Sequence, residues 1–224
     1  AAAYSRDGNL SGLASGLRDM DIKMGGLQPS DLIVLAGRPA MGKTALATNI
    51  AFNIAQKWRG EVQPDGQMKS VDGGVVGFFS LEMSAEQLAT RILAERTGIS
   101  SSSIRRGGIS ESDFDKIRDH SIEMQNLPFY VDDSGGLSIS QLTARARRLK
   151  RQKGLDLLII DYIQLLSGSA DIALDATEVA AQLLRVRRAD GHQLRARDVA
   201  EGFQMGAAHE AQTDHGDFHK LVLS

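Results

Sequence analysis

At residues 37–44 the chain reads Gly37-Arg38-Pro39-Ala40-Met41-Gly42-Lys43-Thr44. This segment fits G-x-x-x-x-G-K-[ST], the pattern of a loop whose backbone N–H groups cradle phosphates. The apolar run Leu32 to Ala36 precedes it and predicts a buried strand. After it, apolar residues recur at spacings of three and four from Thr44 to Lys57, which predicts a helix. This motif requires a strand before it and a helix after it, so a chance match is disfavoured.

The sequence of this loop also predicts the class of ligand that it binds. Its glycines allow the tight turn that points amide groups at phosphates, and the helix dipole adds to the attraction. Lys43 would reach the β- and γ-phosphates, and the Thr44 hydroxyl would ligate magnesium. We therefore expect a nucleoside triphosphate and Mg²⁺ at residues 37–45, from Gly37 to Ala45.

Further apolar runs predict an α/β fold. Val75 to Phe79 and Leu157 to Ile160 are continuous rather than alternating, as in strands covered on both faces, and Phe129 to Val131 is a shorter candidate. Helical patterns lie between these runs, so we expect a mostly parallel sheet with helices on both faces. The predicted helices cover Ser84 to about Arg96, Ser110 to Met124, and Ser138 to Lys153, and Ser84 and Ser110 are expected to cap the first two.

Other segments give weaker signals. Trp58 to Gly74 is polar, Gly-rich and contains Pro64, which predicts an exposed loop. Asp175 to Arg188 could form a helix, but the chain beyond Ser167 has no useful strand-like run. Four of the five histidines fall near the end of the chain, and their spacing fits no defined metal-ligand set.

Two carboxylates are candidate site residues. Asp161 ends the Leu157 to Ile160 run, where the Walker B acid that supports magnesium belongs, although this pattern is weak without the phosphate loop. Glu82 follows the Val75 to Phe79 run and could orient and deprotonate the attacking water. An acid near a helix start also stabilises the helix dipole, and the spacing alone leaves the two readings of Glu82 open.

Composition restricts the class of protein. The chain has no cysteine, which excludes disulfides and cysteine-based zinc sites, and no apolar run of membrane-span length. We therefore expect a soluble, cytoplasmic protein that does not contact a membrane. The net charge of -2 offers no bulk attraction to nucleic acid. Residues 141–153 carry six basic and no acidic side chains; they could face nucleic acid or another subunit, but a solvated helix face is the commoner outcome.

Three blocks together resemble the motor domain of the bacterial replicative DNA helicase of the DnaB type. They are GLQPSDLIVLAGRPAMGKTALATNIAFNIA, FFSLEMSAEQLATRIL and LLIIDYIQLL, and the resemblance runs from about Tyr4 to Gly168. It implies a RecA-like core at residues 31–168, preceded at 1–30 by the end of a linker and the segment leading into the domain. Residues 169–224 form a tail that lacks the quoted blocks.

The resemblance implies an ATP- and Mg²⁺-dependent enzyme that assembles as a hexameric ring on single-stranded DNA during replication. It also implies contacts with primase and a helicase loader. Lys43 and Glu82 become the catalytic residues, Thr44 and Asp161 the magnesium-binding residues, while Gln164 lies in a matching block without an assigned role.

The family's second half normally supplies a sensor glutamine, DNA-binding loops and an arginine finger, and we can place none of these in the tail. The available arginines, none in a matching motif, are Arg185, Arg187, Arg188, Arg195 and Arg197. We therefore expect nucleotide binding with impaired motor function from this chain alone. The alternatives are a nucleotide-binding module without turnover, and a RecA-type recombinase or clock-type ATPase.

Overall fold

The structure is a computed structural model that describes residues 10–29, 31–38, 40–64, 66 and 68–162. Its helices are α1 (Arg18–Met24), α2 (Lys43–Gln56), α3 (Ala85–Thr97), α4 (Ser101–Arg106), α5 (Glu111–Gln125) and α6 (Ile139–Lys153). Its strands are β1 (Arg59–Val62), β2 (Met68–Asp72), β3 (Val76–Ser80), β4 (Phe129–Asp132) and β5 (Leu157–Asp161). Within the described residues, every helix is too short or too polar to cross a lipid bilayer.

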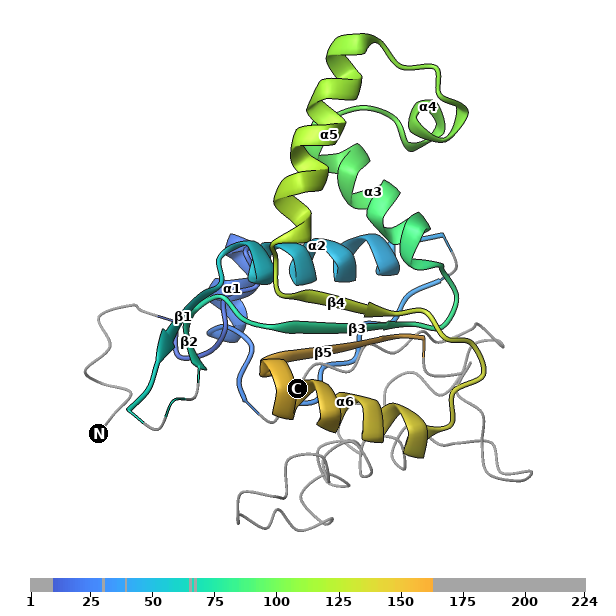
Figure 1. Cartoon of the computed structure of the whole chain (residues 1–224). Coiled ribbons are helices and arrows are strands. Elements are labelled where there is room, and N and C mark those ends of the chain that lie inside the picture. The colour runs from blue at the N-terminus through green and yellow to red at the C-terminus, as the bar shows by residue number, and fades with distance from the viewer. Residues whose placement is uncertain (1–9, 30, 39, 65, 67, 163–224) are drawn as a thin grey trace.

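A three-stranded parallel sheet forms the centre of the molecule, in the order β4-β3-β5. Helix α2 covers one face of this sheet and α6 covers the other (Figure 1). The predicted α/β architecture, with parallel strands covered on both faces, is therefore confirmed. Strands β3, β4 and β5 match the predicted apolar runs to within one residue at each end.

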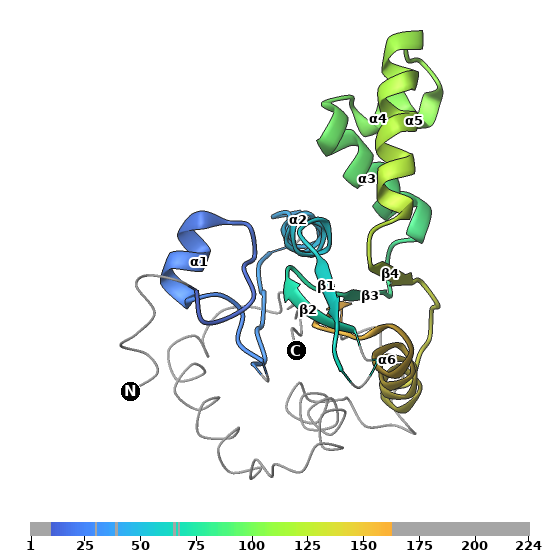
Figure 2. The same cartoon turned by 60° about the vertical axis from the view of Figure 1, so that its left-hand side comes forward.

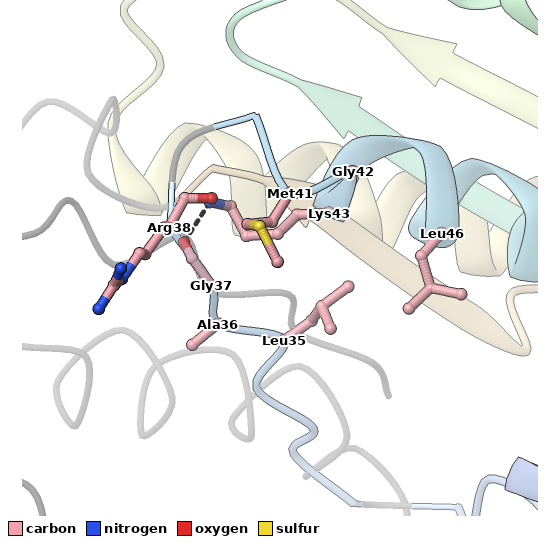
Figure 3. Close-up of a pocket in the computed structure, with 8 residues that line it drawn as sticks. All are labelled: Leu35, Ala36, Gly37, Arg38, Met41, Gly42, Lys43 and Leu46. Atoms are coloured by element: carbon pink, nitrogen blue, oxygen red, sulfur yellow. Dashed lines mark hydrogen bonds between the residues drawn. The ribbon is translucent and has the colours of Figure 1, made fainter.

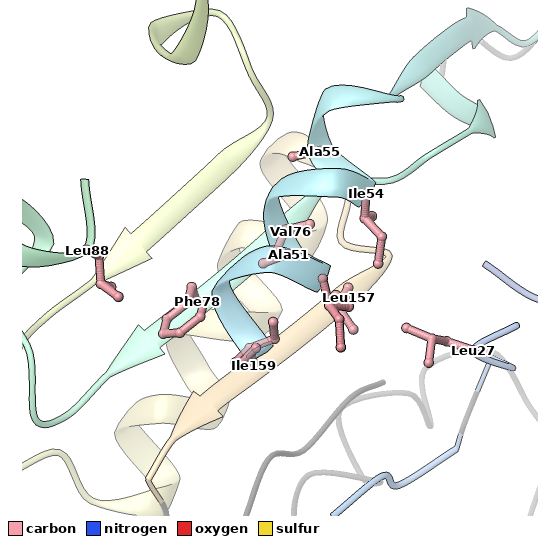
Figure 4. Packing of buried hydrophobic residues seen from close by; sticks show 11 residues of the cluster. Leu27, Ala51, Ile54, Ala55, Val76, Phe78, Leu88, Leu157 and Ile159 are labelled. Carbon is pink, nitrogen blue, oxygen red and sulfur yellow. The ribbon is translucent and has the colours of Figure 1, made fainter. Parts of the chain in front are cut away.

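Alternation along the strands divides the core into two clusters. Val76 and Phe78 of β3 pack on the α2 side, together with Leu157 and Ile159 of β5 (Figure 4). The intervening Phe79, Leu158 and Ile160 pack on the α6 side against Leu142 and Ala146. Both faces are buried, so both sets of positions must be apolar, which is why these strands read as continuous apolar runs.

Serine caps begin helices α3, α5 and α6, and the sequence predicts those at Ser84 and Ser110. Ser84 and Ser138 each complete a capping box, with Gln87 and Gln141 respectively, and the Ser110 hydroxyl accepts a hydrogen bond from the Asp113 N–H. Each cap satisfies backbone N–H groups that the first turn of a helix leaves without a partner. Helix α3 ends at Gly98, whose φ of 72° is the left-handed conformation of a glycine C-cap.

The predicted strand at Leu32 to Ala36 is not found. Its side chains contact both clusters, Leu32 on the α6 side and Ile33 and Leu35 on the α2 side, as in an extended chain. However, a strand also needs a hydrogen-bonding neighbour, and the described residues contain no strand that pairs with this segment. The apolar pattern also overstated burial, because Leu32, Ile33 and Leu35 are only half-buried and Val34 and Ala36 are exposed.

The predicted loop at Trp58 to Gly74 contains an antiparallel hairpin, formed by β1 and β2. Trp58 Nε1 donates to Ser70 Oγ at 3.0 Å, and Ser70 Oγ donates to Asp156 Oδ2 at 2.7 Å. These bonds attach the hairpin to the chain just before β5. The strands are exposed on most positions, so they lack the apolar alternation by which a strand is recognised.

Helices α3, α4 and α5 form a projection from the α2 side of the sheet (Figure 2). The Arg96 guanidinium lies 5.2 Å from the centre of the Phe52 ring, which joins α3 to α2. The sequence did not predict the short helices α1 and α4. The candidate helix at Asp175 to Arg188 lies outside the described residues.

Candidate nucleotide-binding site

The phosphate-loop motif forms a turn that ends at the start of α2. Gly42 is the N-cap residue, with φ of 85°, and its carbonyl accepts the first helical hydrogen bond from Leu46 N–H at 2.9 Å. A Cβ atom at Gly42 would meet no atom within 4 Å, so glycine is needed here for its backbone conformation rather than for space. Ala40 also has a positive φ, of 65°. The turn leaves the first N–H groups of a 14-residue helix available to a ligand.

Lys43 folds back over this loop. Its Nζ donates hydrogen bonds to the carbonyl oxygens of Gly37, at 2.5 Å, and Arg38, at 3.1 Å (Figure 3). Backbone carbonyls are neutral acceptors, whereas phosphate oxygens are anionic and form hydrogen bonds that are roughly twice as strong. The ammonium group is therefore already at the loop and could exchange these contacts for phosphate.

A pocket of about 480 Å³ lies beside the loop. Its lining consists of Leu35, Ala36, Gly37, Arg38, Met41, Gly42, Lys43 and Leu46 (Figure 3). Met41 is 73% exposed, so a large apolar side chain lies in solvent at the loop. Of the predicted loop residues, only Pro39 lies outside the described residues.

The two predicted carboxylates follow neighbouring strands. Asp161 is the last residue of β5 and pairs in register with Ser80, the last residue of β3, two positions before Glu82. Leu81 N–H donates to the Asp161 carbonyl at 2.7 Å, which ties the two strand ends together. Asp161 is buried and Glu82 is exposed. The start of α2 lies at the same end of the sheet (Figure 1), so lysine and both carboxylates share one edge.

Two acidic residues that sequence reasoning missed lie at this edge. Asp132 ends β4, and Asp133 Oδ2 accepts a hydrogen bond from the Ala85 N–H, the first residue of α3, at 2.8 Å. A signal was present, because an acid directly after a predicted strand is the same criterion that selected Asp161. The Phe129 to Val131 run is followed by two acids.

One of the basic residues on α6 has a structural partner. Arg145 Nη1 contacts Asp132 Oδ2 at 2.7 Å and also donates to Ser134 Oγ at 2.8 Å. Burial of the Asp132 carboxyl raises its pKa, but hydrogen bonds from Arg145 and Ser134 and the guanidinium charge together lower that pKa below its ordinary value. Helix α6 also buries Leu142, Thr143 and Ala146 against the sheet, which fits the predicted helix face covering the sheet.

The residues present fit a nucleotide with magnesium. The loop offers backbone N–H groups and one lysine to phosphate, and open space surrounds Gly42 where the loop turns. The Thr44 hydroxyl and the Asp161 carboxylate are oxygen donors, the type that Mg²⁺ prefers. Across the described residues, no cluster of three or more histidine or acidic side chains forms an alternative metal site. Gln164, the four late histidines and the five tail arginines lie outside the described part.

Comparison with known proteins places residues 12–188 in the family model described as the DnaB-like helicase C-terminal domain. The match extends twenty residues beyond Gly168, to which the sequence resemblance runs, and so includes Arg185, Arg187 and Arg188. Residues 189–224 lie outside it.

Individual relatives and solved structures agree with this match. The chain is 43% identical over 166 residues to a replicative DNA helicase DnaB of Rickettsia bellii, covering 74% of this chain and 32% of the relative. It is 34% identical over 189 residues to the replicative DNA helicase DnaC of Bacillus subtilis, covering 83% and 38%. The chain thus spans about a third of the length of these relatives.

Two solved structures share the fold at 27% sequence identity. One is described as an ATPase domain, with a TM-score of 0.67 over 88% of this chain and 64% of that chain. The other is a DnaB-like replicative helicase studied with its primase interactions, with a TM-score of 0.65 over 84% and 44%. The expected RecA-like core is therefore confirmed.

Proposed function

Because the chain belongs to the DnaB-like helicase C-terminal domain family, we propose that it is the ATP-hydrolysing motor domain of a replicative DNA helicase. In this proposal ATP binding and hydrolysis drive movement along single-stranded DNA. The observation that carries it is the joint position of the Lys43 loop, Glu82 and Asp161 at one edge of the sheet. That edge, at the carboxyl ends of parallel strands, is where ligands bind in open α/β sheets.

Each residue of this edge has a distinct role in the proposal. Lys43 and the N–H groups at the start of α2 hold the phosphates, and the Thr44 hydroxyl and Asp161 carboxylate hold Mg²⁺. Magnesium, when bound, neutralises charge on the phosphate oxygens. Lys43 also counts as a catalytic residue, because its charge faces the phosphates as negative charge moves among their oxygens during transfer.

Glu82 is the proposed general base. Its exposed carboxylate lies in the turn between β3 and α3, two residues beyond the strand end that pairs with Asp161. A carboxylate there can accept a hydrogen bond from a water molecule, orient it and take its proton during attack on the terminal phosphate.

The proposed partners follow from the family. We infer that the chain forms a homo-hexameric ring that binds single-stranded DNA, and that primase and a helicase loader are its protein partners. One solved relative, by its description, interacts with primase. A RecA-type recombinase or clock-type ATPase is disfavoured, because the relatives named above are replicative helicases. A module that binds nucleotide without turnover is disfavoured for the same reason.

The test is ATP turnover by the purified chain, with and without single-stranded DNA, in parent and Glu82→Gln forms. We expect the variant to retain ATP affinity and lose most of the turnover, because glutamine keeps the shape but cannot accept the proton. Glu95→Gln, an exposed position on α3, is the matched control and should behave as the parent. Equal turnover in the parent and in Glu82→Gln would contradict the assigned role.

A further inference from the structure

The turn that carries Glu82 is closed by a buried hydroxyl. Ser80, the last residue of β3, is 1% exposed, and its Oγ donates to the Met83 carbonyl at 2.6 Å. This hydrogen bond spans the turn, with Leu81 and Glu82 between donor and acceptor. A buried hydroxyl with one short bond to the backbone restricts the conformations available to the peptide groups on both sides of Glu82.

Both ends of the same turn are attached to neighbouring strands. At its start, Leu81 N–H donates to the Asp161 carbonyl of β5 at 2.7 Å. At its end, Ala85 N–H donates to Asp133 Oδ2, just beyond β4, at 2.8 Å. The second contact is a charge-assisted bond to a carboxylate, which is the stronger kind.

Asp133 is itself held in place by the adjacent ion pair. Asp132 binds Arg145 of α6 through both carboxylate oxygens, at 2.9 and 2.7 Å, and accepts a hydrogen bond from Ser134 N–H at 3.1 Å. These contacts fix the backbone on both sides of Asp133. They connect the turn, through β4, to the helix on the opposite face of the sheet.

Glu82 depends on this backbone for its position. Within the described part of the chain, its carboxylate forms no hydrogen bond or ion pair that would orient it. The side chain is thus available to a ligand, and the turn sets the position and direction from which it extends. Catalysis is sensitive to such placement, because a shift of about 1 Å can cost roughly a hundredfold in rate.

We propose that Ser80 and Asp133 are positioning residues for Glu82, which fix the turn that presents its carboxylate to the attacking water. This inference rests on the proposed function, in which Glu82 is the general base. Ser80 acts across the turn and Asp133 at its end. Loss of either one leaves the phosphate loop intact.

The experiment compares Ser80→Ala and Asp133→Ala with the parent chain. We expect kcat for ATP to fall about tenfold in each, since the carboxylate is displaced rather than removed, while KM and ATP affinity stay within about twofold. Hydrogen exchange should accelerate at the amides of residues 81–85, whether or not turnover is fast. Asp133→Asn keeps an acceptor oxygen and should restore most of the rate.

Two controls separate positioning from general destabilisation. Ser110→Ala removes a helix cap of α5, away from this turn, and should leave kcat unchanged. In the Glu82→Gln background, Ser80→Ala should cause no further loss, because the group that it positions is already inactive.

The outcomes separate failure of the positioning inference from failure of the proposed function on which it rests. If Glu82→Gln turns over ATP as fast as the parent, the role of Glu82 is wrong and the positioning role falls with it. If Glu82→Gln is slow but Ser80→Ala and Asp133→Ala match the parent in kcat, the proposed function stands and the positioning inference is wrong. The positioning inference would also be overturned if Ser80→Ala lowered kcat by the same factor in the parent chain and in the Glu82→Gln background.

Discussion

Lys43 shows how one residue can be prepared for a ligand before the ligand arrives. Its ammonium group is held by two backbone carbonyls of the loop that it serves, so the flexible side chain is partly ordered already. Exchange of neutral carbonyl acceptors for anionic phosphate oxygens then costs little additional side-chain entropy.

The first prediction concerns Lys43→Ala. Hydrogen bonds to charged groups contribute about 1.5–3 kcal/mol, so ATP affinity should fall by roughly tenfold to more than a hundredfold. Lys57→Ala, which removes a lysine at the far end of α2, should leave affinity unchanged. Titration with a fluorescent ATP analogue measures both, and an unaltered affinity in Lys43→Ala would exclude the loop as the phosphate site.

The second prediction concerns pH and the Asp132–Arg145 pair. The pKa of Asp132 is lowered in the fold from its ordinary value of 3.8, so its ionised form stabilises the native state above that pH. This contribution is lost as the pH falls through the lower pKa of the folded state. Because both side chains are partly exposed, Asp132→Asn should cost only about 0.5–1 kcal/mol at pH 7.

Urea unfolding at pH 7 and pH 3 measures this difference in the free energy of unfolding. The cost of Asp132→Asn should shrink at pH 3, where the parent carboxyl also begins to lose its charge. A cost that is the same at both pH values would show that the effect is one of shape rather than of charge.

At the scale of residues, the sequence selects candidate site residues where a local pattern marks them. Lys43 and Thr44 belong to a contiguous motif, and Asp161 is identified by the strand that it ends. Ser80 was missed because its partner, the Met83 carbonyl, is a backbone group in a turn. Asp133 follows a predicted strand, which is the one signal that marks it, but its partner, the Ala85 N–H, is likewise a backbone group. A hydrogen bond to a backbone group imposes no residue type on the partner, so it leaves no pattern to read.

Elements were predictable where burial and capping agree. Strands β3 and β5 are buried at every position, and helices α3 and α6 combine buried apolar residues with serine caps. Helix α5 has a serine cap but no buried residue. The limits of all five were found to within about a residue. The strand predicted at Leu32 to Ala36 was not found, because a strand needs a second segment to pair with and the described residues do not supply it. The β1–β2 hairpin was not predicted for the opposite reason. Its two strands do pair, but neither has the buried face that would mark it in the sequence.

The third prediction concerns Gly73, where the chain leaves β2 and passes close to the end of α2. Gly73 has a φ of 57°, and a Cβ there would lie 2.4 Å from the Trp58 nitrogen and 2.5 Å from the Ile54 carbonyl oxygen. Both obstacles are backbone atoms, which cannot move aside by a change of rotamer. Gly66, in the same hairpin, has a φ of 81°, but a Cβ added there would have no atom within 4 Å.

Gly66→Ala therefore measures the cost of the backbone conformation alone, about 1–2 kcal/mol. Gly73→Ala should cost about 1–3 kcal/mol more, because it adds a steric clash to the same conformational cost. Thermal or urea unfolding of the two variants gives the comparison. Equal costs would mean that the hairpin can shift away from α2 without penalty.

At the scale of the whole molecule, the sheet connects the parts of the site. The loop before α2, the turn after β3 and the end of β5 come from distant parts of the chain. The parallel strands β3 and β5 bring the last two to one edge, and the start of α2 lies at the same edge (Figure 1). The ion pair between β4 and α6 extends this connection to the other face. Small movements of α6 could therefore alter the turn that carries Glu82.

The last prediction concerns the chain acting alone. No arginine finger is assigned among the described residues, and in related P-loop enzymes such a residue contributes about 10³–10⁵ in rate. We therefore expect this chain to bind ATP with Mg²⁺, to hydrolyse it slowly with little stimulation by single-stranded DNA, and to leave duplex DNA unwound. ATP titration, phosphate release and strand separation measure these three properties. Strong DNA-stimulated turnover would contradict the prediction, and Arg185, Arg187 and Arg188, which lie inside the matched region, would then be the first residues to replace by alanine.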